Sequence, residues 1–414
     1  MTGENVVSAS DPASSPRQAA FAFIFVTVLL DMLALGMVIP VLPKLIESFV
    51  AGDTARASEY VGLFGTVWAL MQFIFSPVQG ALSDRFGRRP VILVSNFGLG
   101  VDYVVMALAP NLGWLFAGRV VSGICSASVA TAFAYIADVT PPEQRAARFG
   151  MMGAAFGAGF VVGPAVGGLL GALDPRLPFW AAGAASLING LYGLLIVPES
   201  LPPERRMPFA WRRANPLGAL TLLRTHRELY GLAAANFLGQ LAHVSLPTVF
   251  VLYAGYRYGW GERAVGFTLA LVGVCAIIVQ AGLVGRFVKR FGERGALAIG
   301  LVFGAIGFAV YGIAPNGWLF CVGVPLMALW GLASPAVNGL MSRRVSSAEQ
   351  GQLQGANASI AGIANLVAPV IFAQLFAYAI GAGRDWHLSG APFLLSALLL
   401  FASAALAWRV TRPL

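Results

Sequence analysis

The stretch Gly80-Ala81-Leu82-Ser83-Asp84-Arg85-Phe86-Gly87-Arg88-Arg89-Pro90 joins two long apolar segments in the first quarter of the chain. Gly80 and Gly87 allow two helix ends to approach each other and the loop to turn tightly. Asp84 is expected near the start of the following helix, where a carboxylate interacts favourably with the positive end of the helix dipole. The combination predicts a tight polar turn between two helices.

The same turn carries three arginines, Arg85, Arg88 and Arg89, which can pair with Asp84 or with Asp138 at the end of a later apolar segment. Short loops on the cytoplasmic side of a membrane are generally basic. That tendency accounts for the arginines, but it accounts for neither the glycines nor the aspartate. We therefore interpret the turn as a specific motif at a cytoplasmic membrane face.

Around this turn, the composition is that of an all-α membrane protein. The 414 residues are 58% hydrophobic and only 11% charged, whereas soluble proteins carry about 25% charged residues. A membrane-spanning helix needs about 20 apolar residues, so the chain has room for twelve. We place them near residues 19–42, 60–82, 90–109, 113–137, 148–171, 178–197, 229–253, 264–285, 295–313, 317–340, 353–377 and 390–409.

A long polar stretch separates the first six predicted helices from the last six. The expected organisation is therefore a disordered cytoplasmic tail (1–18), a first six-helix bundle (19–197), a cytoplasmic linker (198–228) and a second six-helix bundle (229–409).

Short motifs recur between the two predicted bundles at one spacing. Arg85-Phe86-Gly87 recurs as Arg290-Phe291-Gly292, and Ala109-Pro110-Asn111 recurs as Ala314-Pro315-Asn316, in each case 205 residues later. Pro164 and Pro369 are separated by the same distance. Because six is an even number of helices, the two copies have the same orientation in the membrane. Parallel six-helix repeats are typical of one large class of transporters.

The net charge of +9 reports orientation rather than a nucleic-acid partner. If the N-terminus is cytoplasmic, most of the 27 lysines and arginines fall on cytoplasmic segments, as is usual for membrane proteins. Both termini are then expected in the cytoplasm and the lipid bilayer is the expected environment. No basic run is interleaved with aromatic residues in a polar stretch, so nucleic-acid binding is not indicated.

Two aspartates, Asp31 and Asp102, interrupt segments that are otherwise apolar. A carboxylate at the middle of a bilayer costs at least about 2.5–3.5 kcal/mol, so it usually faces a polar cavity and has a function there. At a rise of 1.5 Å per residue, Asp31, Asp102 and Gln72 all reach a depth of about 18 Å. Two alternatives remain open: Asp31 pairs with Arg119 for structural reasons, or Asp102 hydrogen bonds to nearby backbone.

A second polar set is predicted on the seventh apolar segment. His243 titrates in the physiological range and shares a helical face with Gln240 and Asn236, which predicts a polar stripe toward a cavity. A buried core histidine is the alternative for His243. For Gln72, the alternative is a hydrogen bond that holds two helices together.

The fifth apolar segment contains the motif Gly157-x-Gly159-x-x-x-Gly163-Pro164-x-x-Gly167-Gly168. Pro164 removes a backbone hydrogen bond and lets the helix bend, while the glycines create a face for close helix packing. The alternative is a packing face with no bearing on the direction of transport.

The turn at residues 80–90 resembles the G-x-x-x-D-R-x-G-R-R signature of the major facilitator superfamily, and the resemblance covers the chain from about residue 20. The glycine-proline segment is similar to the antiporter motif of that family. Within the family, the chain most resembles bacterial tetracycline efflux proteins. The stretches that carry this resemblance are Leu30-Asp31 with Val38-Ile39-Pro40-Val41-Leu42-Pro43, Ala69-Leu70-Met71-Gln72, Gly118-Arg119 with Gly123-Ile124, and Tyr135-Ile136-Ala137-Asp138.

The resemblance implies roles for individual residues. Asp31, Gln72, Asp102 and Arg119 would line a central cavity, joined by Gln240 and His243 from the polar stripe. The cytoplasmic gate would contain Gly80, Asp84, Arg85, Gly87, Arg88, Arg89 and Asp138. The expected function is proton-coupled export of small molecules, of the tetracycline type or other drugs, across the bacterial inner membrane. A monomer driven by the proton-motive force, without a cofactor, is expected.

The sequence also departs from the tetracycline efflux pattern. Gly304 stands where that pattern has an aspartate in the ninth helix, and Ala276 or Cys275 stands where it has a histidine in the eighth. Lys289 occupies, in the second copy of the turn, the place of Asp84 in the first. The substrate is therefore left open, and a proton-coupled importer of a small metabolite is the alternative function. No nucleophile–base cluster or metal-ligand spacing indicates an enzyme.

Overall fold

The computed structural model describes residues 14–126, 129–209, 215–346 and 349–411. Over this part of the chain the secondary structure is helical and contains no strand. The first half consists of α1 (Ser14–Val38), α2 (Leu42–Phe49), α3 (Thr54–Phe86), α4 (Arg88–Leu108), α5 (Leu112–Cys125), α6 (Val129–Val139), α7 (Pro142–Gly171) and α8 (Leu177–Ile196).

A connector with short helical turns follows, and the second half then repeats the pattern of long helices. The connector contains η2 (Pro203–Arg205), η3 (Gly218–Leu220), α9 (Thr221–Thr225) and η4 (Arg227–Leu229). The second half consists of α10 (Tyr230–His243), α11 (Ser245–Tyr258), α12 (Glu262–Ile277), η5 (Ile278–Leu283), α13 (Val284–Ile313), α14 (Gly317–Ala328), η6 (Leu329–Leu332), α15 (Ala333–Ser342), α16 (Gln350–Ile380), η8 (Arg384–Trp386) and α17 (Ala391–Val410).

Eleven helical segments of the described chain are long and apolar enough to cross a membrane. One of them, Glu262–Ile313, contains two of the predicted helices, because the helix assignment runs through a break at Gly292. The backbone there has φ 69° and ψ 174°, a conformation that glycine adopts at little cost. The predicted all-α membrane fold is confirmed.

The start of α1 differs from the prediction of a disordered tail over residues 1–18. The helix already begins at Ser14, so the last five residues of that segment extend the first membrane helix. Residues 1–13 lie outside the described part of the chain.

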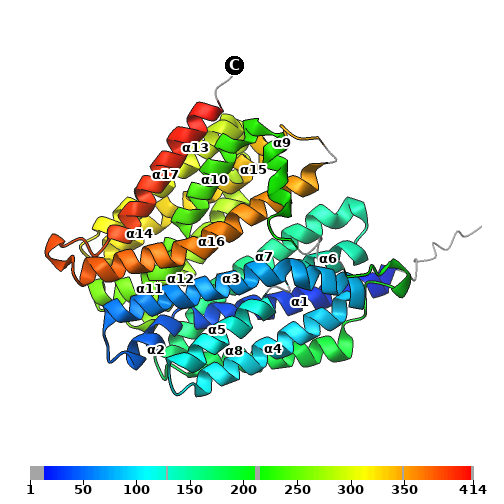
Figure 1. Ribbon diagram of the computed structural model, residues 1–414, viewed down its shortest axis with the longest axis horizontal. Coiled ribbons are helices and arrows are strands. Elements are labelled where there is room, and N and C mark those ends of the chain that lie inside the picture. The colour runs from blue at the N-terminus through cyan, green and yellow to red at the C-terminus, as the bar shows by residue number, and fades with distance from the viewer. Residues whose placement is uncertain (1–13, 127–128, 210–214, 347–348, 412–414) are drawn as a thin grey trace, which may run out of the picture.

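The helices form two bundles, which lie one above the other in Figure 1. The first bundle contains α1 to α8 and the second contains α10 to α17. We call one end of the molecule the basic end; it includes residues 86–88, 139–142, 197–229, 290–294 and 343–346. The opposite end is called the far end; it includes residues 39–54, 109–112, 172–177, 258–262, 314–317 and 381–391.

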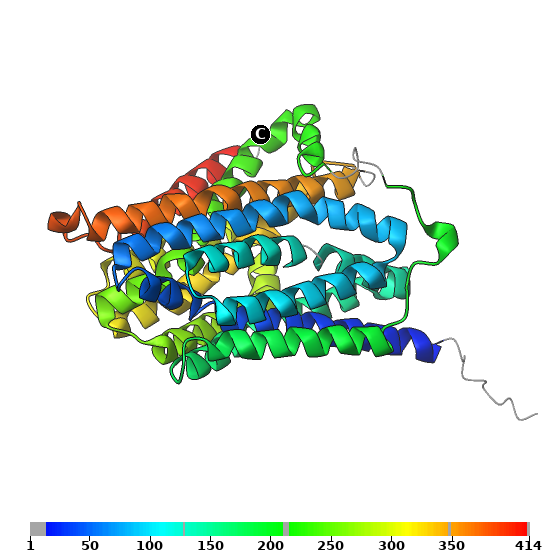
Figure 2. The same ribbon diagram turned by 60° about the horizontal axis from the view of Figure 1, so that its bottom comes forward.

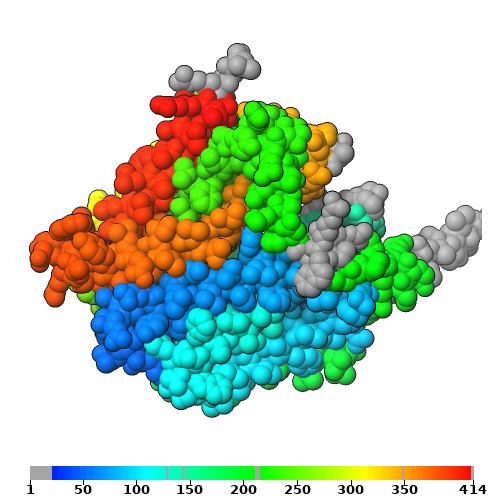
Figure 3. Space-filling model, viewed as in Figure 1, coloured from blue at the N-terminus to red at the C-terminus, as the bar shows by residue number. Residues whose placement is uncertain are grey.

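The bundles meet along two helix pairs, and α3 and α16 run side by side at this boundary (Figures 1 and 2). The Ser58 hydroxyl on α3 donates a hydrogen bond to the Ala373 carbonyl on α16 at 2.8 Å, and Thr66 donates to the Leu366 carbonyl at 3.2 Å. The space-filling view shows the α3 and α16 surfaces in direct contact (Figure 3). These contacts lie in the half of each helix nearer the far end.

The internal repeat is visible in the local geometry of the two halves. Gly87 and Gly292 both have positive φ, 106° and 69°, at the equivalent turns. Asn111 and Asn316 both cap helices, accepting hydrogen bonds from Gly113 N and from Leu319 N, each at 3.0 Å. Recurrent sequence therefore produces recurrent turns and helix starts.

Candidate functional site

Asp31 lies on α1 and its carboxylate is held by a single amide. Asn189 Nδ2, on α8, donates to Asp31 Oδ1 at 2.9 Å and also to the Thr27 carbonyl at 2.9 Å. Asn189 is fully buried. Of the alternatives left open by the sequence, a hydrogen bond between Asp31 and Arg119 is not found among the described residues; the partner of Asp31 is Asn189.

Asp102 lies on α4, facing α5, and is 3% exposed. Its Oδ1 would lie 3.0 Å from a Cβ placed on Gly118, so the absence of a side chain at Gly118 makes room for the carboxylate. Its Oδ2 is buried without a hydrogen-bond partner. Arg119 attracts this carboxylate electrostatically, but the Arg119 guanidinium hydrogen bonds to Ser122 Oγ, at 2.6 Å.

These charged groups form one cluster inside the first bundle. The charges of Asp31, Asp102 and Arg119 all act on the phenol of Tyr103, which is 2% exposed. Asp102 and Arg119 are the only charged side chains that are buried in the described part of the chain. We call Asp31, Asp102 and Arg119 the acidic cluster. Gln72, on α3, is half-buried and makes no hydrogen bond with this cluster.

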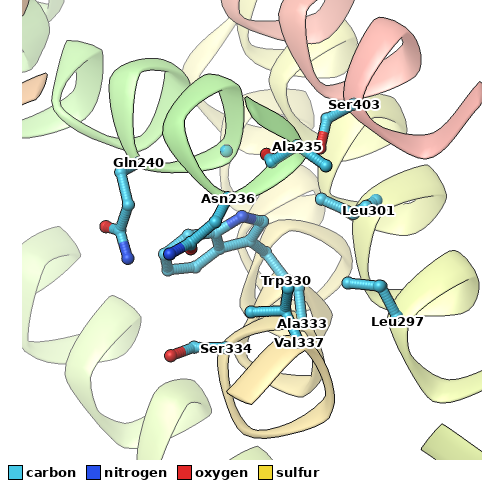
Figure 4. Close-up of a pocket in the computed structure, with 11 residues that line it drawn as sticks. Ala235, Asn236, Gln240, Leu297, Leu301, Trp330, Ala333, Ser334, Val337 and Ser403 are labelled. Atoms are coloured by element: carbon cyan, nitrogen blue, oxygen red, sulfur yellow. Dashed lines mark hydrogen bonds between the residues drawn. The ribbon is translucent and has the colours of Figure 1, made fainter. Parts of the chain in front are cut away.

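A pocket of about 280 Å³ lies in the second bundle, between α10, α13 and the η6–α15 segment (Figure 4). Gln240 and Asn236, two members of the predicted polar stripe, are part of its wall. The full lining is Ala235, Asn236, Gly239, Gln240, Leu297, Leu301, Trp330, Ala333, Ser334, Val337 and Ser403.

The third member of the stripe, His243, stacks on Trp330. The two rings are 4.2 Å apart between centroids and 7° from parallel. His243 Nδ1 and Trp330 Nε1 are both buried without a hydrogen-bond partner. Trp330 was not among the residues predicted from the sequence, where it is one of nine tryptophans in a largely apolar chain.

A chain of amides extends from the same pocket. Asn236 Nδ2 donates to Asn357 Oδ1 at 3.4 Å, and Asn357 Nδ2 donates to Asn338 Oδ1 at 2.7 Å. These bonds connect α10, α16 and α15, so the polar stripe predicted on one helix continues onto two others.

At the basic end, Arg88 joins two carboxylates of the turn motif. Its guanidinium lies 2.5 Å from Asp84 Oδ1 and 3.1 Å from Asp138 Oδ2, and it donates to Ser83 Oγ at 2.7 Å. The pairing of a motif arginine with both Asp84 and Asp138 was open to prediction from the sequence and is present.

Two details of the motif differ from the prediction. Asp84 belongs to the last turn of α3 rather than to the start of α4, because the helix breaks only at Gly87. The α4 start is instead capped by Glu199, whose carboxylate accepts from Arg88 N at 2.9 Å and Arg89 N at 3.3 Å. A Cβ on Gly80 would meet open space, so the expected close helix approach does not occur there.

The other two motif arginines bind elsewhere. The Arg89 guanidinium donates to the Leu194 carbonyl at 2.5 Å, and Arg85 lies over the ring of Phe86. Only Arg88 therefore connects the carboxylates.

The glycine-proline segment of α7 packs on two partners. Gly159, Gly163 and Gly167 face α1 so closely that a Cβ on any of them would overlap α1 backbone atoms. Gly168 faces α12 of the second bundle, where a Cβ would lie 2.9 Å from Gly266 Cα, and the Pro164 carbonyl lies over Gly266. The motif thus connects the helix carrying Asp31 to the contact between bundles.

Two related six-helix bundles, with buried charge in one and a pocket in the other, define a multi-pass membrane transporter of the major facilitator type. The chain belongs to the Major Facilitator Superfamily, whose pattern matches residues 24–369. Members of this family are transporters and not enzymes.

Within the family, the chain is similar to tetracycline resistance proteins. It is 39% identical over 377 residues to the class C protein of Escherichia coli, which covers 91% of this chain and 94% of that protein. It is 34% identical over 365 residues to the class B protein of Escherichia coli, covering 87% and 89%. The predicted resemblance to tetracycline efflux proteins is confirmed.

A solved structure has the same fold. The human organic anion transporter MFSD10 superposes with a TM-score of 0.69 at 23% identity, covering 96% of this chain and 100% of that one. At this identity the likeness concerns the fold alone.

Proposed function

We propose that the protein exports small molecules, tetracycline-like or other drugs, across the bacterial inner membrane in exchange for protons. The observation that carries this proposal is the acidic cluster. A bundle that serves only as a scaffold gains nothing from carboxylates at mid-membrane depth. Similarity to tetracycline resistance proteins over nine-tenths of the chain supports export rather than uptake.

The proton step takes place at Asp31 and Asp102. A proton from the outer solution binds a carboxylate oxygen and cancels its charge, which weakens its hold on a polar or cationic substrate. Loss of that proton to the cytoplasm restores the charge and the binding. Asn189 keeps Asp31 in place in both forms, since its amide can donate to either a charged or a neutral carboxyl oxygen.

Transport proceeds by rocking of the two bundles around the space between them. In this structure, the bundles contact each other through the halves of α3, α7, α12 and α16 nearer the far end. We assign the far end to the outside and the arginine-rich basic end to the cytoplasm, following the usual excess of arginine on cytoplasmic loops. The structure then corresponds to a state closed to the outside.

The Arg88 network is the gate at the basic end. Arg88 holds the end of α3, through Asp84, to the end of α6, through Asp138. A movement of α3 relative to α6 must break one of these ion pairs, so the network stabilises one state of the cycle. Export needs only the monomer and the proton-motive force.

The test uses everted membrane vesicles with a preformed pH gradient and a panel of drugs including tetracycline. Addition of a transported drug should collapse the gradient in wild-type vesicles. Asp31→Asn and Asp102→Asn should each abolish both the collapse and drug accumulation. Drug-dependent collapse that persists in both single variants would refute the role of the acidic cluster.

Asp53→Asn is the matched control. Asp53 accepts a hydrogen bond from Arg56 N at the start of α3, and asparagine caps a helix as well as aspartate. The variant removes one exposed carboxylate without removing the cap, so its activity should equal that of the wild type.

A further inference from the structure

The pocket beside Trp330 is uncharged. None of its eleven lining residues is acidic or basic, and most of them are aliphatic. Its polar groups are few and come mainly from Asn236, Gln240 and Ser334, whose side chains surround the indole in Figure 4. Apolar walls with a small number of placed polar groups are typical of small-molecule sites.

Trp330 is held in a fixed orientation as one wall of this pocket. His243 stacks on its ring at 4.2 Å, and a Cβ on Gly239 would lie 3.7 Å from Trp330 Nε1. On the other side, a Cβ on Gly304 would lie 2.9 Å from Trp330 Cβ. The indole thus occupies the space that a side chain at residue 304 would need.

The indole N–H at this wall is buried and unpartnered. A buried donor without an acceptor costs free energy that an acceptor on a bound molecule recovers. Together with the amides of Asn236 and Gln240 and the Ser334 hydroxyl, it provides hydrogen bonds but no charge.

We propose that this pocket, bounded by Trp330 and Gly304, binds an uncharged aromatic ring of the exported substrate. The ring packs against the indole, and Asn236, Gln240 and Ser334 hydrogen bond to its substituents. This inference rests on the export function proposed above and specifies its substrate class. The substrate is a molecule with a substituted aromatic ring at one end and a polar or cationic group at the other.

The first experiment measures binding to the purified full-length protein in lipid nanodiscs. The probes are ethidium, a cation with amino-substituted aromatic rings, and tetrapentylammonium, a cation without a ring. Trp330→Leu should raise the Kd of ethidium roughly tenfold, as expected for loss of an aromatic packing partner, and leave that of tetrapentylammonium unchanged. Trp330→Phe should give an intermediate value for ethidium.

Trp386→Leu is the matched control, since Trp386 lies at the far end and is 65% exposed; its Kd values should equal those of the wild type. Equal losses for both probes in Trp330→Leu would indicate a structural role and overturn the proposal. So would an unchanged Kd for ethidium, or no binding of ethidium by the wild-type protein.

The second experiment does not depend on a Trp330 variant folding correctly. Ser334→Cys is introduced after the three native cysteines have been replaced by serine, and its rate of maleimide labelling is measured. Ethidium should slow the labelling severalfold, whereas labelling of Ser342→Cys at the end of α15 should not change. Unprotected Ser334→Cys at saturating ethidium would refute the pocket as the ring site.

The two proposals fail in different ways. Failure of drug-dependent proton exchange in everted vesicles would refute export, whatever the binding results. Intact exchange combined with wild-type ethidium affinity in Trp330→Leu would leave export standing and refute the ring site alone.

Discussion

Arg88 and Glu293 are equivalent residues of the two repeats, 205 positions apart, and each forms an ion pair with the same partner position, with the charges exchanged. Arg88 Nε lies 3.1 Å from Asp138 Oδ2, and Glu293 Oε1 lies 3.0 Å from the Arg343 guanidinium. Asp138 and Arg343 are likewise 205 positions apart. The contact between these two positions has therefore been kept in both bundles, although neither residue type has.

The second-bundle pair should tolerate a second exchange of charge. Glu293→Arg and Arg343→Glu each place like charges opposite each other, so each should lower the free energy of unfolding. The loss should be at most about 1 kcal/mol, because Arg343 is mostly exposed. The double variant should recover most of the loss, measured by thermal unfolding of the purified protein.

Arg384→Glu serves as the control for the change of charge alone, because Arg384 is exposed at the far end. It should leave the melting temperature unchanged. A double variant whose loss equals the sum of the single losses would show that the pair contributes nothing.

Arg88→Lys should slow export although the charge is kept. The guanidinium reaches Asp84, Asp138 and Ser83 at once through separate N–H groups, whereas a lysine ammonium is a compact charge without that fork geometry. We expect at least about a tenfold lower export rate in everted vesicles. Arg85→Lys, at an arginine that lies over Phe86, should export normally; equal rates for both variants would contradict the gate role of Arg88.

Gly168→Ala and Gly266→Ala should separate the bundles at the far end. A Cβ on Gly168 would lie 2.5 Å from the Glu262 carbonyl oxygen, and one on Gly266 would overlap the Pro164 carbonyl. Because these neighbours are backbone atoms, one of the two bundles must move. Export should fall about tenfold or more, and cysteines introduced at the far end should become more reactive toward maleimide.

Gly153→Ala is the matched control on the same helix, because a Cβ there would meet open space. Alanine is favoured over glycine in a helix by about 1 kcal/mol, so this variant should be at least as stable as the wild type and equally active. Loss of export in Gly153→Ala would show that α7 requires glycine for some reason other than packing.

His226, in the connector, should give the protein a pH-dependent stability. Hydrogen bonds from its ring nitrogens to Glu349, at 3.0 Å, and to Glu228, at 2.9 Å, raise the pKa of His226 above its ordinary value of 6.5. A raised pKa means that the stabilisation is fully present below pH 6.5 and is lost as the pH rises through the raised value.

The partner carboxylate sets the acid limit of the same contact. Hydrogen bonds from Ser346 and then His226 lower the pKa of Glu349 from 4.5 to about 2. Its contribution is therefore present above pH 4.5 and is lost as the pH falls toward 2. The melting temperature of the wild type relative to His226→Gln should be greatest between pH 4.5 and 6.5 and should decline above that range. A difference that stays constant from pH 6 to 9 would contradict this.

Much of the fold could be predicted because it follows from one-dimensional patterns. Apolar length located the membrane helices, and the 205-residue spacing identified equivalent turns such as Gly87 and Gly292. Local chemistry such as the capping asparagines Asn111 and Asn316 repeats with that spacing, so it was predictable at the same level.

The partners of the site residues could not be predicted in the same way. Depth along a helix placed Asp31 near the membrane centre, but depth does not give the direction of a side chain around the helix axis, so Asn189 was missed. The Glu293–Arg343 pair was missed because its charges are reversed relative to Arg88 and Asp138. Trp330 gave no signal, since a tryptophan in an apolar helix is ordinary until its stacking on His243 is seen.

Gly304 and Trp330 share one volume, and this restricts how the chain can change by mutation. An acidic residue at position 304, as in the tetracycline efflux pattern, would collide with the indole unless position 330 first became smaller. A smaller residue at position 330 alone would remove the wall of the pocket before any carboxylate arrived. The passage between an aromatic and an acidic second bundle therefore runs through an intermediate that has neither, so a descendant of this protein can adopt the other chemistry only by first losing its own.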